Sequence, residues 1–164
     1  MKNKTYFIFV LSCFLLFILS FNFFQSRRPF SESEVIKITN EARKQAGLPA
    51  LSPDQRLAAA ARDKLHDMKL REYFSHQAPD GEQPWGWFEK NGYLFVYAGE
   101  NLAVNFTDAE SLIQAWLASP SHKKNLLNPE FKNIGVSVEN IKIDGKKYAV
   151  VVQLLGTPKT LTLK

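Results

Sequence analysis

Cysteine is almost absent from this chain of 164 residues, and the single one, Cys13, lies in an apolar run near the N-terminus. The rest of the chain therefore has no disulfide and depends on a hydrophobic core, which a domain of this size can form. Exported domains without cysteine are more typical of bacteria than of animal secretions, in which disulfides dominate.

Acidic residues are missing from the first 31 positions, whereas four of the 21 Lys and Arg residues lie at positions 2, 4, 27 and 28. The net charge of +5 is therefore concentrated at the N-terminus. From residue 31 onward, the remaining 17 basic residues face all 16 acidic residues, which leaves a net charge of about +1. This balance argues against a nucleic-acid-binding surface.

Charge is also missing from residues 5–24, a run of 20 predominantly apolar residues. As a helix, this run would match a hydrocarbon core of about 30 Å. We predict that residues 1–30 form a membrane anchor or signal peptide with a short linker. An uncleaved anchor is favoured because no clear small-x-small cleavage site follows the run. A cleaved signal peptide and a lipid-modified Cys13 are alternatives, and basic residues at both ends leave the orientation open.

The familiar hydrolase motifs are missing too, since neither Gly-x-Ser-x-Gly nor His-Glu-x-x-His occurs. Histidine is scarce, with only three in the chain. His66 falls beside the apolar stripe of an expected helix, so we interpret it as a boundary residue with its polar tip in water. His76 and His122, together with Glu100, are a residue set suited to proton transfer or to binding a divalent metal.

Two helices are predicted in the first half of the soluble part. Ser31-x-x-Glu34 is a capping box that begins the first, and Gly47 ends it. Ser52-Pro53 is expected to begin the second, with Ser52 as the N-cap. The apolar stripe of this second helix consists of Leu57, Ala61, Leu65 and Met68.

The middle of the chain predicts shorter elements. We expect a short helix over residues 84–90 and an irregular strand or loop over residues 93–105. Thr107-x-x-Glu110 resembles a second capping box, and Ser119-Pro120 begins a further helical turn that contains His122. The helix after Thr107 has an apolar face formed by Ala109, Leu112, Ile113 and Trp116.

Strands are predicted at the C-terminal end, over residues 134–143 and 147–155. Asp144-Gly145 between them is a strong hairpin signal. Apolar residues point to both faces of the last strand, which indicates helices packed on both sides of the sheet.

Several short motifs occur together in a characteristic order. They are Ser75-His76, Gly99-Glu100-Asn101-Leu102, Trp116-x-x-Ser119-Pro120-x-His122, Asn125-Leu126-Leu127, Phe131, Ile134-Gly135-Val136 and a final strand with Gln153. This set resembles the CAP superfamily, or SCP domain, of cysteine-rich secretory, antigen five and pathogenesis-related proteins, and most closely its disulfide-free bacterial branch. The resemblance covers about residues 31–156. It implies an α+β fold, an α-β-α sandwich with a small central antiparallel sheet, within a domain over residues 31–164 that follows the N-terminal hydrophobic helix.

The resemblance also implies a cleft lined by His76, Glu100 and His122. Many members of the superfamily have two histidines and two acids there, and some bind zinc or another divalent cation. This chain has Ser119 in place of the second acid, and the Gly-His-Tyr-Thr-Gln motif of the final strand is absent. The tetrad chemistry is therefore not transferred to this chain.

Each of the three residues also has a plain structural interpretation. Glu100 lies in an apolar run, so its carboxylate should be buried and must have a partner. A histidine is the simplest partner, and the alternative is that the carboxylate caps backbone N–H groups. The dipole of a helix disfavours a positive charge on His122 in its first turn, and a neutral imidazole is what a metal ligand or a base requires. Alternatively, His122 is a surface residue of the helix without a role in a site. His76 is either a cleft residue or an imidazole bonded to backbone. Groove-lining by Trp85, Trp87 and Trp116 is a further option, with core packing favoured for Trp116.

Two functional classes remain. The first is a binding or signalling module on the extracytoplasmic side of a membrane, expected to be a monomer, whose cleft takes a divalent metal, lipid, glycan or protein. The second is a metal-assisted peptidase with Glu100 as general base and His76 and His122 as ligands of a divalent metal such as zinc. Binding is favoured because two protein ligands are fewer than the three usual at catalytic zinc.

Overall fold

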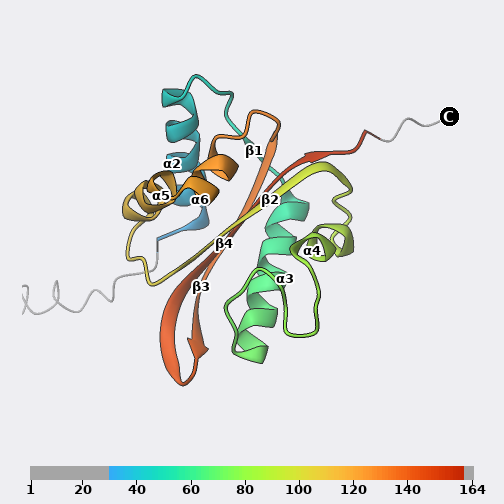
Figure 1. The fold of residues 1–164 in the computed structure, drawn as a ribbon, viewed down its shortest axis with the longest axis vertical. Helices are drawn as coiled ribbons and strands as arrows, with labels where there is room; N and C mark the ends of the chain where they lie inside the picture. Colours follow the sequence, from blue (N-terminus) through green and yellow to red (C-terminus); the bar gives the residue numbers. More distant parts are fainter. Residues whose placement is uncertain (1–29, 161–164) are drawn as a thin grey trace, which may run out of the picture.

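The fold has three layers, with a sheet between two groups of helices (Figure 1). The structure is a computed structural model that describes residues 30–160. One group of helices consists of α2 (Glu32–Gln45), α5 (Ala109–Ala118) and α6 (Pro120–Leu126). The other consists of α3 (Gln55–Arg71) and α4 (Pro84–Lys90). The predicted mixed fold with helices on both sides of the sheet is therefore confirmed.

The central sheet has four strands in the order β1-β3-β4-β2. Their bounds are β1 (Ser52–Pro53), β2 (Phe95–Val104), β3 (Asn133–Ile143) and β4 (Lys146–Pro158). The β3–β4 hairpin turns at Asp144 and Gly145, which both have positive φ, as the sequence predicts. Three strands are antiparallel, but the short β1 runs parallel to β3, so the expectation of a purely antiparallel sheet is wrong for β1.

Strand β4 contributes to two separate hydrophobic clusters, one on each face of the sheet. Val150, Val152 and Leu154 pack with residues of α3 and α4, whereas Val151 and Leu155 pack with residues of α2, α5 and α6. All five side chains are fully buried. Burial of each stabilises the fold by roughly 1.5–3 kcal/mol. The predicted two-sided burial of the last strand is confirmed.

Two helices begin at residues other than those predicted. Ser52 pairs with β3 instead of capping a helix, and its amide donates to the carbonyl of Lys132 (2.9 Å). The N-cap of α3 is Asp54, whose carboxylate accepts from the amide of Arg56 (2.9 Å). The N-cap of α5 is Asp108, not Thr107. The capping box at the start of α2 is formed as predicted, with Ser31 as its N-cap.

Helix α3 lies unusually close to the sheet at Gly135 of β3. A Cβ atom at this position would lie 2.2 Å from the carbonyl carbon of Leu57 and 2.3 Å from the amide nitrogen of Ala58. Only glycine permits this approach without a shift of backbone. The close packing brings the residues of α3 that follow Leu57 against the sheet.

The predicted anchor over residues 5–24 lies outside the described residues. Within residues 30–160, no helix is both long enough and apolar enough to cross a membrane.

Candidate functional site

Glu100 of β2 is the centre of the candidate site. Its side chain is only 2% exposed, and its Oε1 lies 2.5 Å from Nδ1 of His76. Its Oε2 lies 3.0 Å from Nζ of Lys64, an ion pair without the alignment of a hydrogen bond. The prediction of a buried carboxylate paired with a histidine is thus confirmed, and the capping of backbone N–H groups is not what holds it.

Lys64 of α3 is a site residue that the sequence analysis missed. Its side chain has no exposed surface, and its ammonium also donates to the backbone carbonyl of His76. Burial lowers the pKa of Lys64, while the nearby charge of Glu100 acts in the opposite direction. The Lys64–Glu100 pair therefore holds His76 at two points, the ring and the backbone.

A signal for Lys64 is present in the sequence. It follows Ala61 by three residues and precedes Met68 by four, so it lies on the apolar stripe of α3. A lysine on such a stripe must either extend to water or find a buried acid. The structure shows the second outcome.

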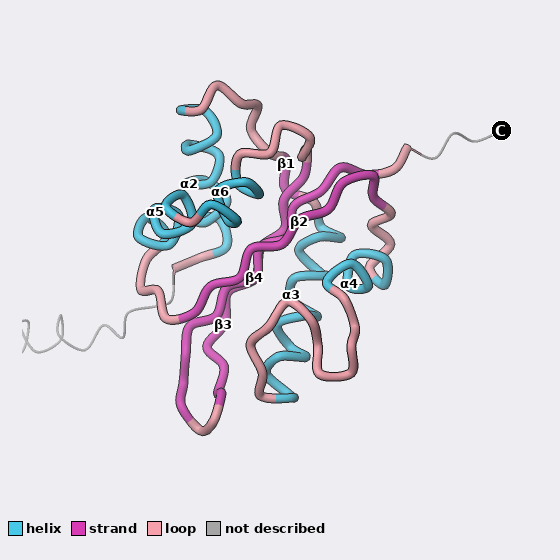
Figure 2. Tube along the Cα trace, in the orientation of Figure 1, coloured by secondary structure: helices cyan, strands magenta, loops and turns pink. Residues whose placement is uncertain are grey.

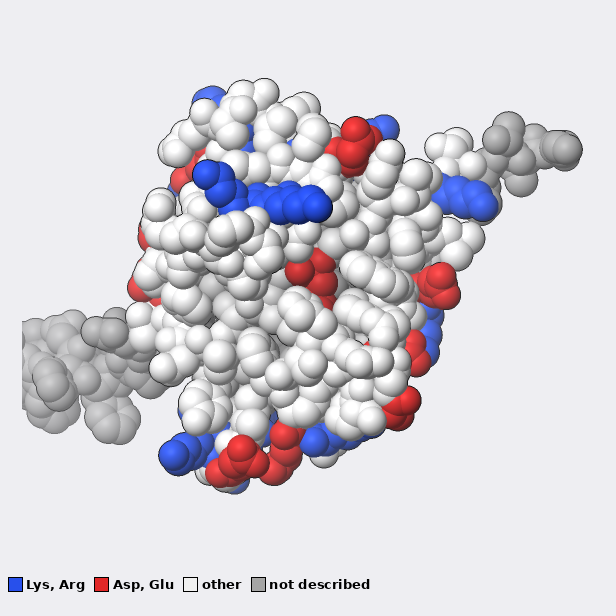
Figure 3. Space-filling view, viewed as in Figure 1, with Lys and Arg blue, Asp and Glu red and all other residues white. Residues whose placement is uncertain are grey.

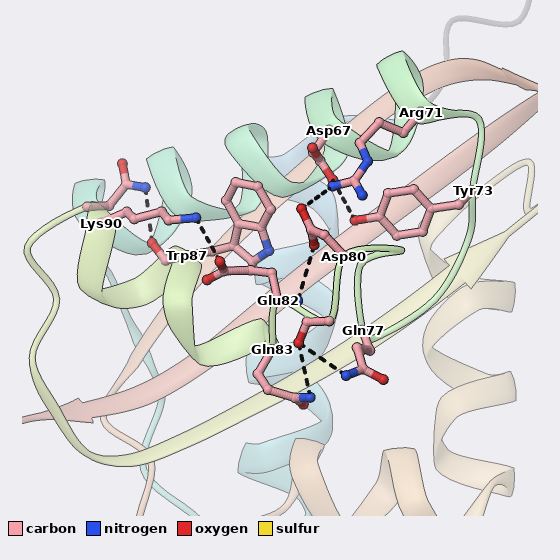
Figure 4. Close-up of polar contacts among 11 residues, drawn as sticks. Asp67, Arg71, Tyr73, Gln77, Asp80, Glu82, Gln83, Trp87 and Lys90 are labelled. Atoms are coloured by element: carbon pink, nitrogen blue, oxygen red, sulfur yellow. Dashed lines mark hydrogen bonds and ion pairs between the residues drawn. The ribbon is translucent and has the colours of Figure 1, made fainter.

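The loop that carries His76 is fixed to α3 by polar contacts (Figure 4). Arg71 donates to Asp80 (2.8 Å), and the hydroxyl of Tyr73 donates to Asp67 (2.8 Å). Burial and the carboxylate of Asp67 raise the pKa of Tyr73, so this hydroxyl keeps its proton. The imidazole of His76 remains 59% exposed, so its ring is anchored on one side and open to solvent on the other.

His122 lies in the first turn of α6, as predicted, and is only partly exposed. Its Nδ1 lies 2.8 Å from Oγ of Ser119, and its ring stacks on Trp116 with centroids 6.1 Å apart and an interplanar angle of 19°. Burial lowers the pKa of His122, and positive charge on His76 lowers it further. Both effects keep the imidazole neutral. Trp116 itself is 2% exposed, which confirms the core packing predicted for it.

Side-chain amides connect the two sides of the site. Asn101 of β2 donates to the side-chain oxygen of Gln153 (3.0 Å) and to the carbonyl of His122 (3.5 Å). Asn125 of α6 donates to the carbonyl of Glu100 (2.9 Å) and to the side chain of Asn101 (3.0 Å). The helix that carries His122 is therefore bonded directly to the strand that carries Glu100.

The other end of α6 is held by Arg43 of α2, which is fully buried. Its Nη1 donates to the carbonyls of Leu126 and Asn128, both at 2.9 Å. These are carbonyls at a helix end, where a cation is favourable. Arg43 thus fixes the position of α6 and hence of His122. Like Lys64, it was not identified from the sequence.

The remaining aromatic and histidine predictions concern residues around the site. His66 is exposed on α3, as expected for a boundary residue. Trp85 is 39% exposed and packs against Phe88 and Phe95. Trp87 is partly buried beneath the ammonium of Lys90.

A resident three-ligand metal does not fit these residues. Both oxygens of Glu100 are engaged by Lys64 and His76, and the Nδ1 atoms of His76 and His122 already have partners. Within residues 30–160, no group of three or more His, Cys, Asp or Glu side chains is arranged to hold a metal ion. Binding of zinc through His76 and His122 alone stays a prediction.

Comparison with protein families supports the resemblance stated above. The model of the cysteine-rich secretory protein (CAP) family matches residues 36–154, well over half of the chain. The chain belongs to the CAP family. The match spans His76, Glu100 and His122 and also covers Lys64.

Two relatives come from Bacillus subtilis. The chain is 40% identical over 105 residues to the uncharacterized protein YkwD, an alignment that covers 64% of this chain and 41% of YkwD. It is 36% identical over 109 residues to the uncharacterized membrane protein YlbC, covering 66% of this chain and 32% of YlbC. The CAP domain described here thus matches less than half the length of either relative.

Solved structures show the same fold. An extracellular protein containing an SCP domain from Bacillus anthracis superposes with a TM-score of 0.65 and 32% identity, covering 77% of this chain and 40% of that one. An outer surface protein from Borrelia burgdorferi superposes with a TM-score of 0.66 and 26% identity, covering 76% and 90%. Both are bacterial proteins, in agreement with the expected branch of the family.

Proposed function

We propose that this CAP domain is a binding module that takes its ligand beside Glu100 of β2, and that the imidazoles of His76 and His122 both contact this ligand. His76 is held by Lys64 and Glu100, and His122 is held by Ser119 and Trp116. Preorganised side chains of this kind lower the entropy cost of binding a ligand.

The engagement of Glu100 is the observation that supports binding over hydrolysis. A general base must reach the proton it removes, directly or through one water molecule. The carboxylate of Glu100 is 2% exposed and already paired with Lys64 and His76. Its role in this proposal is to position His76, and a metal-assisted peptidase would instead be revealed by cleavage of a peptide library that depends on Glu100.

We further propose that the module works on the extracytoplasmic side of a membrane. The uncharged run of residues 5–24 is long enough to span a bilayer. One relative is described as an extracellular protein, another as an outer surface protein and a third as a membrane protein. Full-length protein in the soluble cytosolic fraction would contradict this placement.

The binding proposal can be tested with a panel of four probes: zinc chloride, phospholipid vesicles, a glycan array and a degenerate peptide library. The full-length chain in detergent is compared with its His76→Ala/His122→Ala variant. His66→Ala is the matched control, because His66 is exposed on α3 and contributes nothing to the site. We expect at least one probe to be retained by wild type and His66→Ala but not by the double variant. Equal retention by all three proteins would refute the proposal.

A further inference from the structure

The first half of β2 has an unusual, uncharged sheet edge. Strand β2 is the last strand of the sheet, and within residues 30–160 it pairs only with β4 (Figure 2). Side chains of α5 and α6 cover its second half, since Trp116 donates to the carbonyl of Leu102 and Asn125 to that of Glu100. No corresponding side-chain bonds are formed to residues 94–98 from the described part of the chain.

Exposed apolar side chains gather at this uncovered half. Six large hydrophobic side chains are exposed among the described residues. Four of them belong to this region: Trp85 (39%), Leu94 (45%), Val96 (58%) and Tyr97 (44%). Trp85 of α4 adjoins this part of the strand because its ring contacts that of Phe95, with the ring centroids 6.3 Å apart. The surface over the start of β2 is largely uncharged, and charged side chains lie at its margin over α4 (Figure 3).

Edge strands are normally protected against pairing by lysine, proline, an inward-pointing charge or a bulge. The sequence Leu-Phe-Val-Tyr-Ala at residues 94–98 contains no charge and no proline. A bulge is present, because Phe95 and Tyr97 pair with consecutive residues of β4 and Val96 has no partner. The bulge limits any added strand to a few residues, but it also leaves backbone groups of Val96 unpaired.

We propose that this edge binds an extended, uncharged peptide segment of a partner protein by strand addition. Backbone groups at a sheet edge are complemented by another strand, and exposed apolar side chains supply pockets for alternate residues of that strand. The edge continues directly into Gly99 and Glu100, so a bound peptide would extend toward His76 and His122. The inference rests on the proposed binding function and names its ligand class.

Two other occupants fit the surface less well. Phe30, from which the predicted anchor leaves, packs with α2 and α5, whereas Phe95 packs on the opposite face of the sheet with α3 and α4 (Figure 1). Phe30 and this edge are therefore parts of clusters on opposite faces of the sheet. A second copy would pair along only a few residues, whereas a stable interface generally buries at least about 1,000 Å².

The test uses the full-length chain in detergent and a fluorescein-labelled heptapeptide of alternating valine and threonine. Binding is measured by fluorescence polarisation, and the bound segment is located by hydrogen exchange.

We expect protection of the amides of residues 94–98, and affinity about tenfold lower for Val96→Lys, which places a charge on the edge. Leu70→Lys is the matched control, since Leu70 is a 69% exposed apolar residue on α3. A heptapeptide with proline at its centre should also bind about tenfold more weakly, because it lacks a backbone donor.

Equal affinity of Val96→Lys and wild type, or protection elsewhere, would overturn the proposal. Failure of the peptide to bind would overturn it as well. In that case, weaker self-association of Val96→Lys in sedimentation would identify a second copy as the occupant, and protection of residues 94–98 by bilayer nanodiscs would identify a membrane. The His76→Ala/His122→Ala variant separates the two proposals. If this variant binds the heptapeptide with wild-type affinity and its residues 94–98 are still protected from exchange, peptide docking is supported and the role of the imidazoles is refuted. The two proposals can therefore fail separately.

Discussion

Lys64 and Glu100 form an ion pair that is almost completely shielded from solvent, with side chains 0% and 2% exposed and Nζ 3.0 Å from Oε2. Removing two charges from water is costly, so a buried pair of this kind adds little net stability. Loss of only one partner should nevertheless destabilise the domain, because the charge of the other would remain buried without a counter-charge. The pair therefore fixes the position of the His76 loop more than it stabilises the domain.

Replacement of Glu100 by Gln should destabilise the domain by about 3–5 kcal/mol, since the ammonium of Lys64 would lose its counter-charge. The acceptor of Nδ1 of His76 would also change from a charged carboxylate oxygen to a neutral amide oxygen, which makes a weaker hydrogen bond. Urea unfolding followed by circular dichroism would measure the change. The exposed pair Lys37–Glu41 is the control, and Glu41→Gln should cost less than about 1 kcal/mol.

A double-mutant cycle separates pairing from the loss of two polar groups. Lys64→Met/Glu100→Gln should be less destabilised than the sum of the two single variants, because neither buried charge then lacks a partner. Strict additivity would show that Lys64 and Glu100 do not depend on one another, contrary to the ion pair seen here.

The stability of the domain should depend on pH through His122. Because burial and the charge of His76 lower the pKa of His122 in the folded state, the unfolded chain takes up its proton first as pH falls. This contribution to stability is complete above about pH 6.5 and is lost as pH falls through that value toward the folded pKa.

Urea unfolding at pH 7.5 and 5.5 would measure this dependence in wild type and in His122→Gln. The loss of stability on acidification should be smaller in His122→Gln, and His66→Gln should behave as wild type because His66 is exposed. An equal loss in His122→Gln and wild type would mean that other groups cause the acid sensitivity.

Gly135→Ala should be strongly destabilising, by about 1–3 kcal/mol or more, because its Cβ would overlap the backbone of α3 at Leu57 and Ala58. Gly86→Ala is the control. The atom nearest to its Cβ is the carboxylate oxygen of Glu82, the end of a flexible side chain. Thermal unfolding would compare the two, and similar melting temperatures would disprove the tight approach of α3 to β3.

Much of the fold was predictable because each element carries a local signal. The β3–β4 hairpin follows from Asp144-Gly145, and the two-sided burial of β4 follows from its apolar residues at consecutive positions. The errors occurred where two local signals compete. Ser52-Pro53 is a plausible helix start, but pairing with β3 uses it as a strand, and Asp54 then caps α3.

The site was predictable only in part, because its partners are distant in the chain. An acid inside an apolar run must be paired, which predicted a histidine as the partner of Glu100, and the structure identifies that histidine as His76. Lys64 lies 36 positions before Glu100, and only the tertiary approach of α3 to β2 shows that they meet. Arg43 was missed for a similar reason, since its acceptors are backbone carbonyls that have no sequence signature.

Zinc should bind at most weakly to the isolated site, because only two imidazoles are available and catalytic zinc usually has three protein ligands. Any binding should weaken as pH falls, because zinc binds to neutral imidazole and competes with protons for the ring nitrogens. Isothermal titration with zinc chloride at pH 7.5 and 5.5 would measure this, with His76→Ala/His122→Ala as the control. Tight binding that survives in the double variant would place the metal elsewhere.

We propose above that this site holds a ligand without transforming it. One mass-spectrometric measurement tests this claim, in which the full-length chain is incubated with a degenerate peptide library and both retained and cleaved peptides are counted. We predict retention of intact peptides by wild type, loss of retention in His76→Ala/His122→Ala, and no cleavage by either protein. Cleavage by wild type that disappears in Glu100→Gln, while that variant remains folded, would contradict the account and identify Glu100 as a catalytic base.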